Sequence, residues 1–164
     1  MKHLDGRAAA VVGAPLGTCF SLVAAIERYP GWCGEYVREV TDIERDDDGR
    51  AQRAHVRVHV AQSPFAKNYE FDAAVRIDPP RGVQLSRVPS GPSDLERLSL
   101  SWSLVEGEGT RIVGLEFFAT VSFLPRLVPL PGVGDLIART LLDSAVHALG
   151  GSVAPAGRAR SSGQ

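Results

Sequence analysis

The segment from residue 131 to 149 constrains the fold most, because it is the longest stretch of the chain with helical periodicity. Its apolar positions are Val133, Leu136, Ile137, Leu141, Leu142, Ala145, Val146, Ala148 and Leu149. They cover more than half of the helix circumference, whereas a surface helix usually shows an apolar stripe about 100° wide. The pattern therefore predicts a long helix, about 29 Å at 1.5 Å per residue, that is enclosed more than usual.

Alternating segments precede this helix. After a first strand at 7–14, apolar and polar residues alternate over 34–45, 51–61, 68–78, 83–88, 96–106 and 111–123. Turn signals separate several of them, such as Asp48-Gly49 and Pro79-Pro80. Seven short strands with brief turns are typical of one antiparallel sheet. An α+β fold with a curved seven-stranded sheet around the terminal helix satisfies both patterns.

The stretch between the first two strands is expected to be helical. Pro15 suits a first helical turn, and Phe20, Val23 and Ile26 follow at helical spacing. The Tyr29–Trp32 corner, Tyr-Pro-Gly-Trp, is expected to stop the helix because the residue before a proline disfavours the α region.

Composition narrows the class of protein. The chain has 164 residues with 18 basic and 19 acidic side chains, a balance that disfavours a dedicated nucleic-acid binder. Cys19 and Cys33 have no zinc-ligand spacing, so inert buried thiols are expected. Interrupted apolar runs near both ends argue against a secretion signal and a membrane-spanning helix. We expect one cytoplasmic domain over residues 5–150, a flexible tail over 151–164, and a monomer or weak homodimer.

Several short motifs carry a resemblance to a known family. They are Gly13-Ala14-Pro15, the run from Ile26 to Trp32, Asp48-Gly49-Arg50, Gly109-Thr110-Arg111-Ile112 and the block 129–149. With the element order they resemble the START-like/polyketide cyclase superfamily (SRPBCC), nearest to the cyclase/dehydrase and coenzyme Q-binding START-like proteins. The resemblance implies a helix-grip fold with a short helix pair between strands 1 and 2. It also implies an apolar cavity between sheet and terminal helix.

By alternation, one face of the sheet and helix supplies the candidate ligand-binding residues. They are Tyr69, Phe71, Leu85, Leu100, Trp102, Leu115, Phe117, Leu136, Ile137 and Leu141. Each of them could equally fill the core. An apolar pocket also needs a few placed polar groups.

No confident catalytic residue emerges, and three polar side chains are weak candidates. Arg87 is in phase with Val83 and Leu85 and enters the cavity unless the strand has already ended. Tyr36 follows the proline corner and either donates to a ligand or keeps its hydroxyl in water. His147 continues a polar seam with Thr140 and Ser144, which faces either the ligand or solvent.

Metal and cofactor sites are not expected. His55 and His59 lie opposite Val56 and Val58 in the alternation, and positions i and i+4 of a strand are about 13 Å apart. Gly132-Val133-Gly134 lacks the third glycine of a dinucleotide fingerprint.

Three functions remain open. The first is binding or transport of a hydrophobic small molecule, such as a lipid, quinone or polyketide. The second is a polyketide cyclase/aromatase or dehydrase, which requires titratable groups converging in the cavity. The third is a protein or transient membrane contact through the proline-rich loop at 123–133.

Overall fold

The computed structural model describes residues 3–62, 65–107, 110–120 and 132–150. The strands are β1 (His3–Val12), β2 (Val37–Arg45), β3 (Ala51–Gln62), β4 (Phe65–Asp78), β5 (Gly82–Arg87), β6 (Leu98–Gly107) and β7 (Thr110–Thr120). The helices are α1 (Leu16–Ala24), the 3-10 turn η1 (Ile26–Arg28), α2 (Tyr29–Trp32) and α3 (Val133–Ala148).

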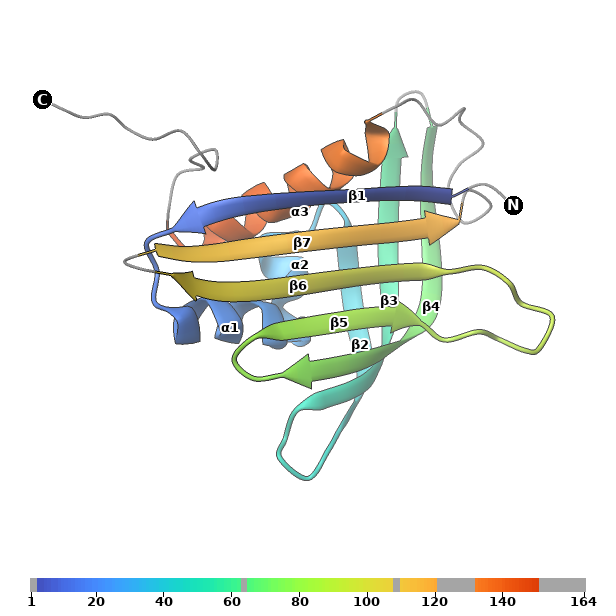
Figure 1. The fold of residues 1–164 in the computed structure, drawn as a ribbon. Coiled ribbons are helices and arrows are strands. Elements are labelled where there is room, and N and C mark those ends of the chain that lie inside the picture. The colour runs from blue at the N-terminus through green and yellow to red at the C-terminus, as the bar shows by residue number, and fades with distance from the viewer. Residues whose placement is uncertain (1–2, 63–64, 108–109, 121–131, 151–164) are drawn as a thin grey trace, which may run out of the picture.

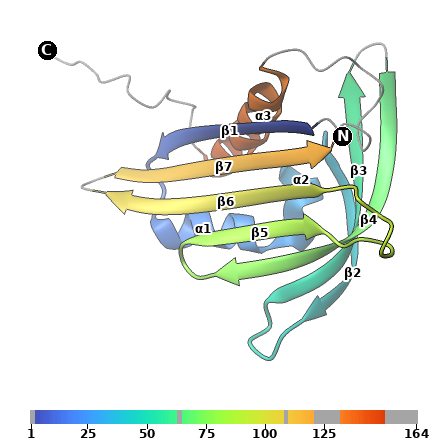
Figure 2. The same ribbon diagram turned by 45° about the vertical axis from the view of Figure 1, so that its right-hand side comes forward.

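The strands form one seven-stranded sheet in the order β1-β7-β6-β5-β4-β3-β2. Every neighbouring pair is antiparallel. The sheet bends, so that β3 and β4 run nearly across the direction of β1, β7 and β6, and the helices lie inside the bend (Figures 1 and 2). The predicted α+β helix-grip architecture is therefore confirmed.

One predicted boundary is wrong. The first helix ends at Ala24, before the corner expected to stop it, and residues 29–32 form α2, the second member of the expected helix pair. Pro30 falls in the first turn of α2, where a missing N–H breaks no helical hydrogen bond. The hydroxyl of Tyr29 donates to the Val23 carbonyl and fixes α2 against α1. A tertiary contact has overridden the local preference of the residue before proline.

The terminal helix α3 packs on β1 and β7. Its first turn lies so close to β1 that a Cβ at Gly6 or Gly134 would collide with the backbone of the other segment. The first turn of α3 is also hydrogen-bonded to β1, because the Arg7 amide donates to Asp135 Oδ1 at 3.0 Å. Two glycines and one carboxylate therefore dock the start of α3 onto the sheet.

Candidate functional site: the two ends of the concave face

The register shows which side chains share the concave face, since directly paired residues of antiparallel strands project to the same side. Trp102 pairs with both Leu115 and Val83 in the middle of the sheet. Further along, Leu85 pairs with Leu100 and Val75, and Arg87 pairs with Ala73. The residues around Trp102 and the residues around Arg87 therefore lie towards opposite ends of the same concave face.

The closed end is covered by α1, η1, α2 and the last turns of α3. Its side chains exclude solvent almost completely, with Trp102 at 2% and Leu115 at 1% exposure. The Trp32 ring packs edge-on against Tyr29 and Trp102, with centroids 4.9 and 5.9 Å away. Burial raises the pKa of Tyr29 well above its usual value. This end is a packed core, in which the indole nitrogens of Trp32 and Trp102 are buried with no hydrogen-bond partner among the described residues.

The open end lies where β4, β5 and β6 leave the cover of the helices. Its apolar side chains pack against the core on one side and remain half-buried. They are Val58, Phe71, Leu85, Leu98, Leu100 and, on α3, Ile137. Tyr69 is also half-buried and pairs with Val58 in the register. A row of half-covered apolar groups on the inside of a bent sheet is the feature that needs a functional explanation.

Polar groups border this open end. Arg87 lies on the concave face with its side chain only 13% exposed, and its Nη1 contacts Asp94 Oδ2 at 2.8 Å. The same nitrogen donates to the Glu96 carbonyl at 3.2 Å. Arg87 follows the inward phase of β5, one of the two positions left open by the sequence, and its charge is held by a partner that sequence spacing did not reveal.

Asp94 is held as firmly as Arg87. Its carboxylate accepts hydrogen bonds from the Ser90 amide at 2.8 Å, the Ser90 hydroxyl at 2.9 Å and the Glu96 amide at 3.1 Å. These bonds, the Ser90 amide first among them, together with Arg87 keep the pKa of Asp94 far below its usual value. The loop between β5 and β6 is therefore organised around one ion pair.

Tyr69 completes the border. Its pKa is raised, mainly by burial and secondly by the negative charge of Glu96. Glu96 lies two residues after Asp94 in the same loop and is half-buried. Tyr69 therefore stays protonated at neutral pH, with a hydroxyl able to donate or accept.

The other predicted ligand residues do not all lie at the open end. Trp102, Leu115 and Leu141 lie in the closed core, with Leu141 at 6% exposure. Leu136 is 61% exposed and is not enclosed by the fold. The side chain of Phe117 lies outside the described part of the structure, as do most of the loop at 123–133 and the predicted tail at 151–164.

The three weak catalytic candidates are not brought together. Tyr36 is half-buried and packs against the core beyond α2. His147 is exposed near the end of α3, about 20 Å along the helix from Gly134. The hydroxyls of Thr140 and Ser144 donate to the carbonyls of Leu136 and Thr140 within the same helix. The predicted polar seam is thus satisfied locally.

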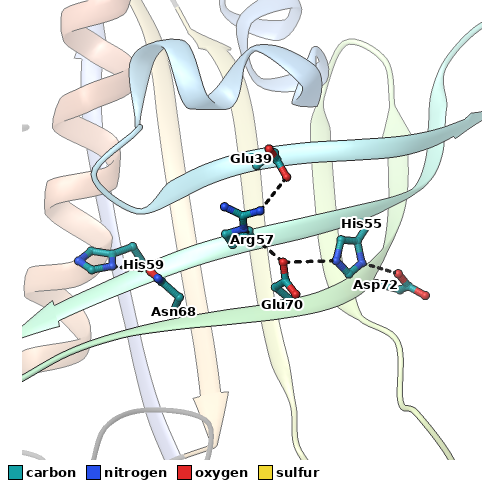
Figure 3. Close-up of polar contacts among 7 residues, drawn as sticks. All are labelled: Glu39, His55, Arg57, His59, Asn68, Glu70 and Asp72. Atoms are coloured by element: carbon teal, nitrogen blue, oxygen red, sulfur yellow. Dashed lines mark hydrogen bonds and ion pairs between the residues drawn. The ribbon is translucent and has the colours of Figure 1, made fainter.

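The convex face carries an ion-pair network on β2, β3 and β4 (Figure 3). Arg57 contacts Glu39 at 3.1 Å and Glu70 at 3.2 Å, while His55 Nδ1 lies 3.0 Å from Asp72. His59 contacts Asn68 instead of a second histidine. The placement of His55 and His59 on the outer surface is confirmed, and they share no ligand position.

Cys33 is a buried thiol. Burial raises the pKa of Cys33 to about 12, so its thiol is unreactive at neutral pH. Within the described segments, no three His, Cys, Asp or Glu side chains cluster as metal ligands would. In the same part of the chain, no helix has the length and apolar character needed to cross a bilayer.

The comparisons with known proteins agree with this architecture. A START superfamily protein from Mycobacterium smegmatis superposes with a TM-score of 0.68 at 18% identity, covering 90% of this chain and 97% of that one. Zhui aromatase/cyclase from Streptomyces sp. R1128 gives 0.52 at 15% identity, with coverage of 90% and 87%. Ginseng major latex-like protein 151 from Panax ginseng gives 0.56 at 13%, with coverage of 88% and 94%.

At these identities the structural similarity shows the fold alone. The comparison with curated proteins gave no match. The family model described as polyketide cyclase / dehydrase and lipid transport, however, matches residues 12–146, which is most of the chain. The chain therefore belongs to the polyketide cyclase/dehydrase and lipid transport family and has its START-like helix-grip fold.

Proposed function

We propose that the chain binds a hydrophobic small molecule, of the lipid, quinone or polyketide-like kind, at the open end of the concave face. The observation that carries the proposal is the band of half-buried apolar side chains, among them Phe71, Leu85 and Leu100, beside a fully packed core. Family membership and the fold support the same class of ligand.

The energetics of this proposal rest on apolar burial. Covering about 200 Å² of apolar surface stabilises a complex by about 5 kcal/mol at 25 cal/mol per Å². Part of that gain is lost to the immobilisation of the ligand. A carrier that must release its cargo needs an affinity of this moderate kind.

Extraction of the purified protein tests the proposal first. The protein as purified is extracted with organic solvent, and the extract is identified by mass spectrometry. We expect an apolar compound at a fixed ratio to protein, or uptake of quinone, fatty-alcohol or polyketide probes by protein that was empty. Empty protein that takes up no such probe would reject the proposal.

A matched pair of variants on β6 then locates the site. Leu100→Gln puts a polar group into the half-buried band, whereas Val105→Gln changes a side chain that is already 56% exposed. Losing the burial of one leucine costs about 2 kcal/mol, which is about thirtyfold in affinity. We expect that loss for Leu100→Gln only, measured by fluorescence titration with N-phenyl-1-naphthylamine.

A second function, polyketide cyclase/aromatase or dehydrase chemistry, is favoured by the Tyr69 hydroxyl. A protonated tyrosine beside an apolar band can donate to a ligand carbonyl as a general acid would. The test incubates the protein with a linear poly-β-ketone thioester and follows ring formation by mass and absorbance. Turnover that falls in Tyr69→Phe while probe binding is retained would favour the enzyme over the carrier.

A further inference from the structure

The polar groups that border the open end restrict the class of ligand further than the apolar band does. We infer that this border selects amphiphiles whose polar end is a hydrogen-bond donor without negative charge, such as a hydroxyl, and rejects carboxylates of the same chain length. The inference rests on the proposed function and specifies the ligand class of the same site.

The first step concerns the positive charge of Arg87. Arg87 is the only arginine in β5, and a guanidinium at the end of an apolar band would ordinarily suggest an anion site. Its Nη1, however, contacts Asp94 at 2.8 Å, and both side chains are nearly closed to solvent, at 13% and 11% exposure. A ligand carboxylate would have to compete with a carboxylate of the protein that is already in place.

Asp94 cannot easily give up that position. Ser90 donates to it through both backbone and side chain, and the Glu96 amide donates to its other oxygen. Moving Asp94 away would break these bonds as well as the ion pair. Asp94 therefore neutralises the charge of Arg87 and occupies its Nη1 side, so that a ligand carboxylate could not take that position without displacing Asp94.

The second step concerns Glu96. This side chain is half-buried, and its carboxylate makes no hydrogen bond or ion pair with the described residues. It lies near enough to Tyr69 for its charge to oppose ionisation of the phenol. The next cation in the chain, Arg97, is exposed. Among the described side chains of the border, Arg87, Asp94 and Glu96 together have one negative charge in excess.

The chemistry of recognition follows from these groups. A carboxylate with no partner among the described residues offers a ligand only acceptors. A ligand hydroxyl supplies a donor to Glu96. A ligand carboxylate supplies only acceptors and repels Glu96 in partly desolvated surroundings, where screening by salt is weak.

Competition between ligands of equal chain length tests the inference. The neutral probe N-phenyl-1-naphthylamine is displaced from the wild-type protein by 1-decanol, methyl decanoate, decanoate and decylamine at about pH 8, where decanoate is ionised. Decanol and decylammonium are expected to compete best, methyl decanoate less well, and decanoate worst. The expected difference between decanol and decanoate is about tenfold, the effect of one partly screened charge.

Two variants with the same change in net charge provide the control. Glu96→Gln removes the unpaired carboxylate, whereas Glu44→Gln removes an exposed one on β2. We expect decanoate to gain about tenfold in Glu96→Gln and decylammonium to lose a similar factor, with no change in Glu44→Gln. Thermal unfolding of both variants checks that the fold is intact.

The outcomes separate the two proposals. If neither the probe nor any of the four ligands binds, the proposed function fails, and the inference with it. If the ligands bind but decanoate equals decanol, or if both glutamate variants change the ranking equally, the inference alone is wrong.

Discussion

The two ends of the concave face are built from the same kinds of residue but differ in what covers them. At the closed end, α1, α2 and the later turns of α3 reduce Trp102 and Leu115 to 2% and 1% exposure. At the open end, Leu85 and Leu100 occupy the same face of neighbouring strands and remain half-buried. The comparison shows that helix placement, more than strand composition, separates the closed core from the half-buried apolar band in this fold.

The largest expected effect contrasts the stability of the two ends. Trp102→Ala empties a packed position and should lower the free energy of unfolding by about 3–5 kcal/mol, whereas Leu100→Ala at a half-buried site should cost under about 2 kcal/mol. Urea denaturation measures both. Equal losses would mean that Leu100 is as much a part of the core as Trp102.

The second effect concerns the docking of α3. Gly134→Ala places a methyl group against the Asp5 backbone and should cost about 1–3 kcal/mol through overpacking. Gly17→Ala in α1 meets no atom within 4 Å and should be neutral or stabilising, by up to about 1 kcal/mol, because alanine favours a helix. If Gly134→Ala is as harmless as Gly17→Ala in thermal unfolding, α3 is not fixed at the contact described.

A third, smaller effect tests the ion pair at the border. Because the folded state holds the pKa of Asp94 below its unfolded value, Asp94 stabilises the fold above about pH 4 and loses this effect as the pH falls further. Asp94→Asn should therefore lower the urea midpoint at neutral pH, and the difference from wild type should shrink in acid.

Asp47, an exposed residue of the turn between β2 and β3 that is distant from Asp94 in the sequence, provides the control for that experiment. Asp47→Asn should leave the urea midpoint nearly unchanged at every pH. A difference between Asp94→Asn and wild type that persists undiminished in strong acid would show that Asp94 acts through packing and not through its charge.

The smallest effect concerns Tyr69. Glu96→Gln should move the pKa of Tyr69 towards its usual value without reaching it, because burial is the larger cause of the shift. Tyrosinate absorbance during alkaline titration measures the change, and Tyr69→Phe identifies the transition. An unchanged titration in Glu96→Gln would place Glu96 too far from Tyr69 to shape the site.

Periodicity was enough to predict most of the architecture. Alternation along the strands and the wide apolar surface of 131–149 indicated a sheet enclosing a helix. For Arg87 the phase of β5 left an inward and a solvated position open, and the register places it on the inner face. Such patterns work because they depend only on which side of an element each residue occupies.

The features that periodicity did not predict depend on contacts between segments that are distant in the sequence. Alternation identifies the face of Trp102 and Leu100 but not which of them a helix covers. The Gly6–Gly134 approach joins the two ends of the chain, and nothing local marks it. The Asp94 site could have been suspected from the serine four residues before it, a spacing at which side chain and backbone donors can converge on a carboxylate.

The most direct test of the central claim maps a bound ligand by methyl NMR. On titration with 1-decanol, the methyl resonances of Leu85, Leu98, Leu100 and Ile137 should shift with saturation, while those of Val23, Val83, Leu104 and Leu142 should stay in place. Shifts that concentrate on the second group, or no saturable shift in either group, would contradict the assignment of the open end as the binding surface.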